Sequence, residues 1–496
     1  KDPGGGEVHM EASTAAPQLE RRAVGLPTAI STVFGLIVAT TVLVSVGQGF
    51  AASWIFLVAL AIAIVAMYMQ ALSFSELATM IPKAGSMNEY VRAGLGAFAG
   101  SLTALMGYIA IMVFPTAAES LFPAIIITDF FEIAGDPKLW VTIIVLAVAA
   151  LNVFGVRPFA AVEIALTVLV AISLLGFGVI GILGLGSGDT VSSALPGADF
   201  EWGTLTGLLG LAVFTFVGLE YACPLAEELD NPRRELPLGM FLGLGLITVP
   251  VVLYGIGATR YLPADQLGDP TQLTNMNIAI AMLGDAGKWW MGLVSIAATV
   301  STLNAVLAGI PRLLYGMSYT QQAPRAFGYI LPRTRAPVVG IAVMAAIPIL
   351  MNVFDAATSS TFIELILAGV LGWATAYILI HISLIVLRLR EPEVPRPFRS
   401  PLFPIPQLLG IGLLIWAAIE IFPDPDIESN IYRNYLIFLG ISVVVAFVYN
   451  AFAMKSVGAQ FRPIPFREIM REVETIEEVD RRVTPDDPRA DTLAKP

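Results

Sequence analysis

Long apolar segments alternate with short polar segments along most of the chain. A helix needs about 20 mostly apolar residues to cross the hydrocarbon core of a bilayer. The segments that meet this requirement lie at approximately residues 27–50, 52–80, 98–128, 139–156, 160–186, 203–226, 237–259, 289–318, 337–354, 361–388, 405–422 and 433–453. The pattern predicts an all-α integral membrane protein with about 12 transmembrane helices.

The composition agrees with a membrane protein. The 496 residues are 56% hydrophobic and only 14% charged, whereas soluble domains carry roughly 25% charged residues. The formal charge of −11 lies largely in the terminal tails and short loops. We therefore expect membrane lipid around the chain and no nucleic-acid partner.

The positive charges between the segments favour one orientation. With the N-terminus in the cytoplasm, fourteen Lys and Arg residues fall in inside loops and four in outside loops. Because inside loops carry an excess of Lys and Arg, this bias predicts a multi-pass protein of the cell membrane with both termini cytoplasmic.

The two ends of the chain differ from the apolar region between them. Residues 1–10, which include His9, are expected to be a cloning remnant, and residues 11–25 a cytoplasmic N-terminal segment. Residues 26–455 form the predicted transmembrane domain, and residues 456–496 a charged cytoplasmic tail. The tail sequence EIMREVETIEEVDRR predicts a short amphipathic helix, which we expect to be solvated rather than to plug the inner mouth.

Residues that carry chemistry are scarce. The single Cys223 excludes an internal disulfide and a thiolate metal cluster, and His381 is the one imidazole outside the N-terminal remnant. No metal site and no cofactor are therefore expected. The chain also lacks a P-loop, an HExxH motif and a filter-like repeat, which disfavours an ATP-driven pump, a membrane enzyme and a channel.

Two apolar segments have sequences that are typical of an interrupted helix. In residues 33–50, VFGLIVATTVLVSVGQGF, glycines bracket Thr and Ser residues. Residues 211–237 contain Gly218 in mid-span, Glu220 two residues later, and Pro224, which has no backbone donor. Transporters bind substrate where helices break near the midplane, because the freed backbone groups can face the ligand. The two segments stand first in two five-segment halves, as an inverted repeat requires.

Four stretches carry a resemblance to a known family. They are residues 75–96 (SELATMIPKAGSMNEYVRAGLG), 214–237 (FTFVGLEYACPLAEELDNPRRELP), 301–327 (STLNAVLAGIPRLLYGMSYTQQAPRAF) and 387–405 (LRLREPEVPRPFRSPLFPI). In their order and spacing, the chain resembles the amino acid–polyamine–organocation (APC) transporters over about residues 24–455. The resemblance implies a LeuT-like five-plus-five inverted repeat with two extra C-terminal helices, in which helices 1 and 6 are interrupted.

The first break departs from the family pattern. Relatives usually carry a glycine-rich motif there, whose amides hold the substrate carboxylate. The aligned residues of this chain, which we consider candidates for substrate contact, are Ala39, Thr40, Thr41, Val42, Leu43 and Ser45. The missing glycines keep a non-amino-acid amine, such as a polyamine or an amino alcohol, as an alternative substrate. Some proton-coupled relatives carry a Lys in helix 5, where this chain has Val170. The resemblance therefore implies that this chain lacks that lysine for proton coupling.

Further candidates come from the second break and from the tenth segment. Those for substrate contact are Phe214, Phe216, Val217, Gly218, Glu220, Tyr221, Trp373 and Tyr377. The backbone from Phe216 to Gly218 is the favoured partner of a substrate amine, and Glu220 either caps freed amides or ties helices together. Trp373, Tyr377 and His381 recur at every fourth position, so they share a helix face that either lines the pathway or packs.

Ionisable residues inside apolar segments are functional candidates, because burying them is costly. Glu119 could bind a substrate ammonium or carry a proton, unless it touches water at the outer end of its span. Glu163 and His381 are further candidates for proton coupling. For Glu163, which lies two turns past Arg157, an interfacial or inter-helix ion pair is the favoured alternative.

The interrupted segments and the ordered motifs together predict a secondary transporter in residues 26–455. It would move amino acids or related amines by alternating access, through proton symport or exchange, and it would not be an enzyme. Glu76 is expected to stabilise the cytoplasmic gate, and Asn304 to hydrogen-bond neighbouring helices. A channel or receptor is less favoured, and a monomer and a homodimer both stay open.

Overall fold

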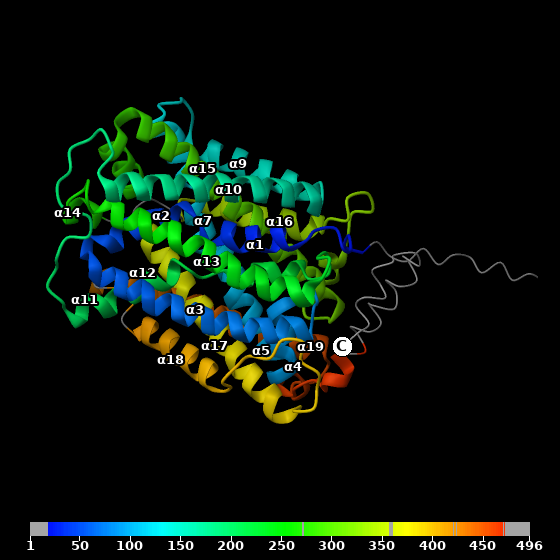
Figure 1. Ribbon diagram of the computed structural model, residues 1–496. Helices are drawn as coiled ribbons and strands as arrows, with labels where there is room; N and C mark the ends of the chain where they lie inside the picture. The colour runs from blue at the N-terminus through cyan, green and yellow to red at the C-terminus, as the bar shows by residue number, and fades with distance from the viewer. Residues whose placement is uncertain are drawn as a thin grey trace, which may run out of the picture.

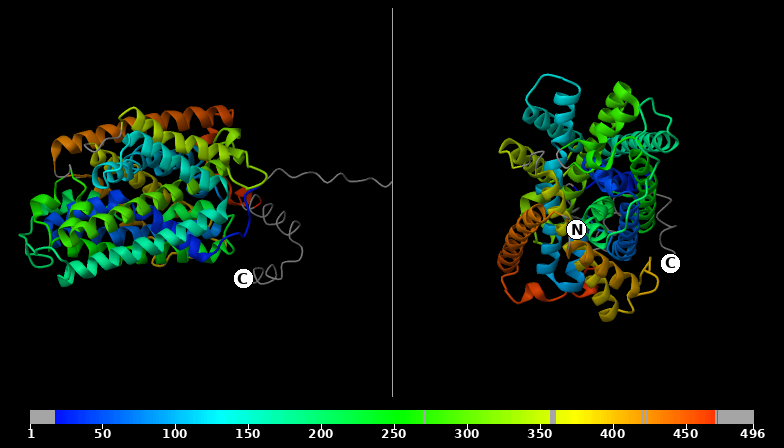
Figure 2. Two further views of the ribbon diagram at one scale, coloured as in Figure 1. Left: turned by 90° about the horizontal axis from the view of Figure 1, so that it is seen from above. Right: turned by 90° about the vertical axis from the view of Figure 1, so that its left-hand side faces the viewer.

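The computed structural model describes residues 18–269, 272–356, 361–419, 421–422, 424–469 and 471. Within them the regular elements are helices, which run side by side as one bundle (Figures 1 and 2), and the β-type contact is an isolated bridge between Val24 and Leu229. The predicted remnant 1–10, residues 11–17 of the predicted N-terminal segment, and residues 470 and 472–496 of the predicted tail lie outside the described residues. Most of the predicted amphipathic helix of the tail falls among them.

The α-helices are α1 (Leu26–Ile37), α2 (Thr40–Gly49), α3 (Trp54–Met80), α4 (Ser86–Leu95), α5 (Ala97–Ala104), α6 (Ala110–Val113), α7 (Pro115–Glu119), α8 (Phe122–Ile125), α9 (Pro137–Val153), α10 (Val156–Leu183), α11 (Trp202–Gly207), α12 (Leu209–Phe214), α13 (Pro232–Ala258), α14 (Ala264–Leu267), α15 (Thr274–Tyr319), α16 (Val338–Val353), α17 (Phe362–Arg390), α18 (Ile405–Ile419) and α19 (Pro425–Ala453). Short 3-10 helices are η1 (Phe50–Ala52), η4 (Leu219–Leu225), η5 (Arg325–Gly328) and η6 (Ala459–Phe461). Two π-helical turns are η2 (Leu105–Ile109) and η3 (Ile126–Phe130).

Most of these helices have the length and apolarity of membrane spans. In the described residues, 8 helical segments qualify on their own, and Leu26–Ile37 with Thr40–Ala52 qualifies as a pair bent by 55°. The helices α9, α16 and α18 are apolar but shorter, at 17, 16 and 15 residues. Large apolar side chains such as Ile172 and Val444 are exposed on α10 and α19, which fits contact with lipid rather than water. The predicted all-α, multi-span class is confirmed.

Two predicted segments differ from the helices that form. The eighth was predicted at 289–318. The non-helical residue Gly284, with φ 59°, divides α15 (Thr274–Tyr319) into two helices, and the predicted segment lies within the second. The last was predicted at 433–453, whereas α19 begins at Pro425 because Asp424 caps its first amides. Hydropathy alone missed the helix before Gly284 and the first turns of α19, since polar side chains are frequent in both.

The first span breaks after Ile37. Val38 and Ala39 leave the helical conformation, with Ala39 extended at φ −64° and ψ 154°, and α2 restarts at Thr40. The first amides of a helix have no carbonyl partner within that helix. The break therefore leaves the amides of Thr40 and Thr41 to be satisfied by another part of the bundle.

The sixth span breaks after Phe214. The chain leaves α12, passes through Gly218 at φ 113°, and continues as the tight turns of η4. Glycine is required at this position for two reasons: its φ is positive, and a Cβ would come within 2.4 Å of Leu36 Cδ2. Because Leu36 belongs to α1, the breaks of the first and sixth spans lie against each other.

Buried ion pairs hold helices together at one end of the bundle, where the segment before α1 lies. Arg312 of α15 donates to Glu228, and Arg388 of α17 donates to Glu76 of α3. Arg312 and Glu228 are each 1% exposed. The carbonyl of Glu228 also accepts a hydrogen bond from the amide of Val24 at 3.1 Å, so this pair holds the N-terminal segment against the bundle.

We expect Arg312→Ala to destabilise the protein by about 3–5 kcal/mol, because it leaves Glu228 as a buried charge without a partner. Thermal unfolding in detergent measures the effect. Arg157→Ala is the matched control, since Arg157 is 67% exposed in its pair with Glu20 and such pairs contribute little. Equally small shifts for both variants would contradict this account of the buried pair.

Candidate functional site

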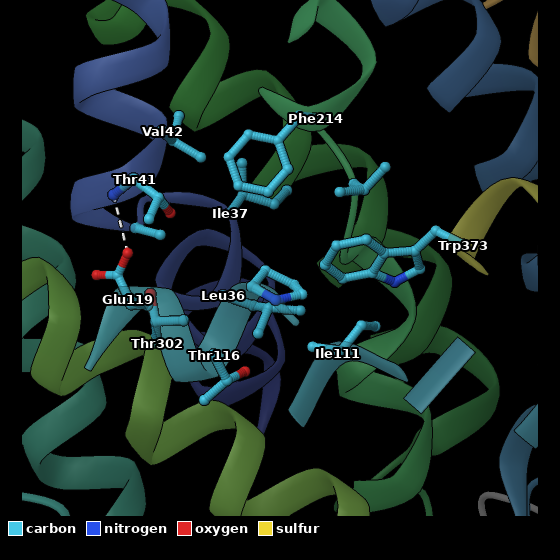
Figure 3. A pocket seen from close by; sticks show the side chains of 13 residues that line it. Leu36, Ile37, Thr41, Val42, Ile111, Thr116, Glu119, Phe214, Thr302 and Trp373 are labelled. Atoms are coloured by element: carbon cyan, nitrogen blue, oxygen red, sulfur yellow. Dashed lines mark hydrogen bonds between the residues drawn. The ribbon is translucent and has the colours of Figure 1, made fainter. Parts of the chain in front are cut away.

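A small buried cavity lies where the two breaks meet. Its volume is about 20 Å³, which leaves room for about one water molecule. The broken first and sixth spans form part of its wall, and α6, α7, α15 and α17 complete it (Figure 3). The lining residues, all of them buried, are Leu36, Ile37, Ala39, Thr41, Val42, Ile111, Pro115, Thr116, Glu119, Phe214, Val217, Thr302 and Trp373.

Glu119 lines the cavity and binds the freed amides of α2. The N–H groups of Thr40 and Thr41 donate to its two carboxylate oxygens at 2.8 Å each, and the hydroxyl of Thr299 donates to Oε1 (Figure 3 shows the Thr41 bond). A carboxylate is stabilised at this position because the N-terminus of a helix carries partial positive charge. Glu119 is 1% exposed, so its interpretation as a water-exposed group is wrong.

A third break brings Glu119 to this position. Phe114 leaves the helical conformation at φ −100° and ψ −87°, and Pro115 starts the short helix α7, which ends at Glu119. Proline has no N–H to continue the hydrogen bonding of the preceding helix. The sequence prediction treated residues 98–128 as one uninterrupted helix, and it did not anticipate this change of direction.

The cavity wall carries one acidic side chain and no basic one. Glu119 is the one ionisable side chain among the lining residues, and in the described part of the chain no ion pair involves it. Thr41 is buried and lines the cavity, and its hydroxyl lies beside the Glu119 carboxylate. Apart from a few hydroxyl groups, the rest of the wall is apolar or aromatic.

Glu220 holds the second break to α17 from outside the cavity. Trp373 Nε1 donates to its Oε1 at 2.9 Å, and the hydroxyl of Tyr377 donates to its Oε2. The same Tyr377 oxygen accepts a hydrogen bond from the amide of Gly218 at 3.0 Å. Glu220 is thus a tie between helices, one of the two roles that the sequence left open. Trp373 lines the cavity, whereas Tyr377 lies behind the wall.

Glu163 of α10 lies in a second polar cluster, beside α1 but outside the cavity. Ser301 Oγ and Asn304 Nδ2 of α15 donate to its carboxylate at 2.7 Å each. A Cβ at Gly35 would come within 1.7 Å of Glu163 Oε1, so a glycine is needed for α1 to pack here. The expected ion pair is wrong: the partners of Glu163 among the described residues are neutral, and Arg157 binds the N-terminal segment instead.

The structure brings some of the predicted residues to the cavity wall and leaves others behind it. Those on the wall are Ala39, Thr41, Val42, Glu119, Phe214, Val217 and Trp373. Those buried but not on the wall are Thr40, Leu43, Ser45, Phe216, Gly218, Glu220, Tyr221 and Tyr377. His381 lies elsewhere, with its Nδ1 at 2.9 Å from the hydroxyl of Ser73, and its role in proton coupling stays a prediction.

Sequence reasoning missed several residues of the wall. They are Leu36, Ile37, Ile111, Pro115, Thr116 and Thr302. A signal for one of them was present: Pro115 precedes Glu119 by four residues in the same helix, and this spacing favours one helix face. The others depend on how distant segments approach one another, which the pattern of a single segment does not contain.

Known proteins resemble this chain over most of its length. The sequence profile of the amino acid permease family matches residues 26–457. The cystine/glutamate transporter of Homo sapiens is 25% identical over 371 residues, which are 72% of this chain and 71% of that protein. The methylthioribose transporter of Bacillus subtilis (strain 168) is 24% identical over 444 residues, 84% and 89% of the two chains. The vacuolar cationic amino acid transporter 4 of Arabidopsis thaliana is 25% identical over 422 residues, which are 78% of this chain and 66% of that protein.

A bundle of apolar helices with interrupted spans around a buried cavity defines a multi-pass membrane protein of the transporter class. The profile match covers most of the chain, so the chain belongs to the amino acid permease family of the APC superfamily. The resemblance drawn from the four sequence stretches is confirmed. The family and the matched relatives are transporters rather than enzymes.

We expect Gly218→Ala to destabilise the protein by about 1–2 kcal/mol from its positive φ alone, with a further penalty from the contact with Leu36. Gly203→Ala is the matched control, because a Cβ at Gly203 meets nothing within 4 Å. The unfolding temperature in detergent should fall for Gly218→Ala and stay near the wild-type value for Gly203→Ala. Equal unfolding temperatures would contradict the packing of the two breaks.

Proposed function

We propose that this chain is a secondary active transporter, which moves an amino acid or a closely related amine across the cell membrane by alternating access. The observation that carries the proposal is that the two interrupted spans meet at one buried cavity. Irregular backbone is tolerated at membrane depth where it lines a cavity or is buried in protein. Broken helices also mark the substrate site in many transporters. Family membership and the names of two relatives support an amino acid as the substrate class.

Twelve membrane crossings are part of the proposal. We count as spans the long apolar helices, the bent pair and the shorter helices α9, α16 and α18. The two broken spans then stand first in two five-helix halves, as in an inverted repeat. The Lys and Arg bias places both termini in the cytoplasm. The end of the bundle that carries the buried Arg312–Glu228 pair would then be the cytoplasmic end.

We propose the proton as the coupling ion and Glu163 as its carrier. The hydroxyl of Ser301 and the amide of Asn304 offer Glu163 hydrogen bonds but no positive charge. A buried carboxylate without a cation is costly unless it takes up a proton. Because Glu163 lies against Gly35 of α1, a change in its protonation would act directly on the packing of the first broken span.

Uptake by purified protein in liposomes tests the proposed function. We expect a labelled amino acid or amine to accumulate when an inward proton gradient or an internal counter-substrate is present, and the initial rate to saturate with concentration. Flux that neither saturates nor depends on a gradient would contradict the proposal and would favour a channel.

Glu163→Gln should separate coupling from transport. Glutamine keeps an oxygen that can accept from Ser301, but it cannot exchange a proton, so accumulation driven by a pH gradient should be lost while exchange of labelled for unlabelled substrate continues. Glu364→Gln is the control, because Glu364 accepts a hydrogen bond from Asn430 outside the cavity, and both activities should persist. Full gradient-driven accumulation by Glu163→Gln would contradict the assignment.

A further inference from the structure

We infer that Glu119 is a built-in counter-anion of the cavity, and that the substrate is an organic amine without a free carboxylate. The inference rests on the transport function proposed above and narrows its substrate class. Three features of the cavity carry it: the amides of α2 are occupied, the wall holds no cation, and the hydroxyl of Thr41 lies beside the carboxylate.

The amides that could hold a substrate carboxylate are already bound. Thr40 N–H and Thr41 N–H each donate to Glu119 at 2.8 Å, and both donors lie at the start of α2. The partial positive charge of this helix end is therefore compensated by a carboxylate of the protein itself. A substrate carboxylate would have to displace a group that is tethered in place and held by a third bond from Thr299.

The cavity wall has no side chain that would receive a second carboxylate. No Lys, Arg or His is among its lining residues, and Glu119 contributes a negative charge. Two carboxylates in one small buried space repel each other strongly, because the effective dielectric constant inside a protein is well below that of water. An ammonium group placed beside Glu119 is attracted by the same charge.

The cavity does offer partners for an ammonium group. The carboxylate of Glu119 has acceptor capacity beyond that used by its three donors, and the buried Thr41 hydroxyl beside it has an oxygen that can also accept. Trp373 lies on the side of the cavity opposite Glu119 (Figure 3), where its ring offers an apolar surface to the far end of a ligand. Apolar side chains between them, such as Ile111 and Phe214, suit the hydrocarbon part of an amine. The cavity of about 20 Å³ must widen to admit it.

Matched ligands test the substrate class on the full-length protein. A panel pairs each amino acid with the amine that remains when its carboxylate is removed, for example leucine with isoamylamine, and binding is measured by calorimetry in detergent. We expect an amine to bind at least about tenfold more tightly than its amino acid. Tighter binding and saturable uptake of an amino acid would overturn the inference and leave the transport function intact. If no member of the panel binds and none is taken up, the transport function itself is contradicted.

Two variants test whether the amine binds at the cavity. Glu119→Gln keeps an oxygen that can accept from an α2 amide but removes the negative charge, so amine affinity should fall at least about tenfold. Thr41→Val removes the hydroxyl and leaves the backbone amide, and amine affinity should fall about threefold or more. Glu364→Gln, outside the cavity, should bind like the wild type. Unchanged amine affinity in folded Glu119→Gln or in Thr41→Val would overturn the inference.

Discussion

The contact between the Glu119 carboxylate and the first amides of α2 is the interaction on which the rest of the site depends. A helix that stops inside a bilayer leaves backbone donors without partners, and each unpaired group costs several kcal/mol. Glu119 satisfies the amides of Thr40 and Thr41 together. The first span can therefore end at Ile37 and restart at Thr40 in the middle of the bundle, and the space between the two pieces becomes part of a cavity.

The buried carboxylates of the described residues fall into two groups. Glu76 and Glu228 have arginine partners at the end of the bundle that holds the N-terminal segment, and Glu89 pairs with an arginine of its own helix. The charges of these three carboxylates are therefore neutralised. Glu119, Glu163 and Glu220 lie near the breaks and have hydrogen-bond donors but no cation. Glu220 is a tie between helices, whereas the lack of a positive partner at Glu119 and Glu163 favours a role with a proton or a cationic ligand.

The fold class, the family and the approximate place of both breaks could be predicted from the sequence. Apolar length identifies spans, and Gly218 with Pro224 indicates an interrupted helix within one segment. The contacts that define the site could not be predicted in this way. Glu119 binds an amide 79 residues away and Glu163 a hydroxyl 138 residues away, so their partners depend on how helices pack. The prediction of an ion pair for Glu163 was wrong for the same reason.

A structure determined with a bound substrate tests the central claim most directly. The account predicts that the carboxylate of Glu119 still accepts from the amides of Thr40 and Thr41, with the ammonium group of the ligand beside Glu119 and its hydrocarbon part directed toward Trp373. A ligand carboxylate on the two amides, with Glu119 moved out of the cavity, would contradict the account.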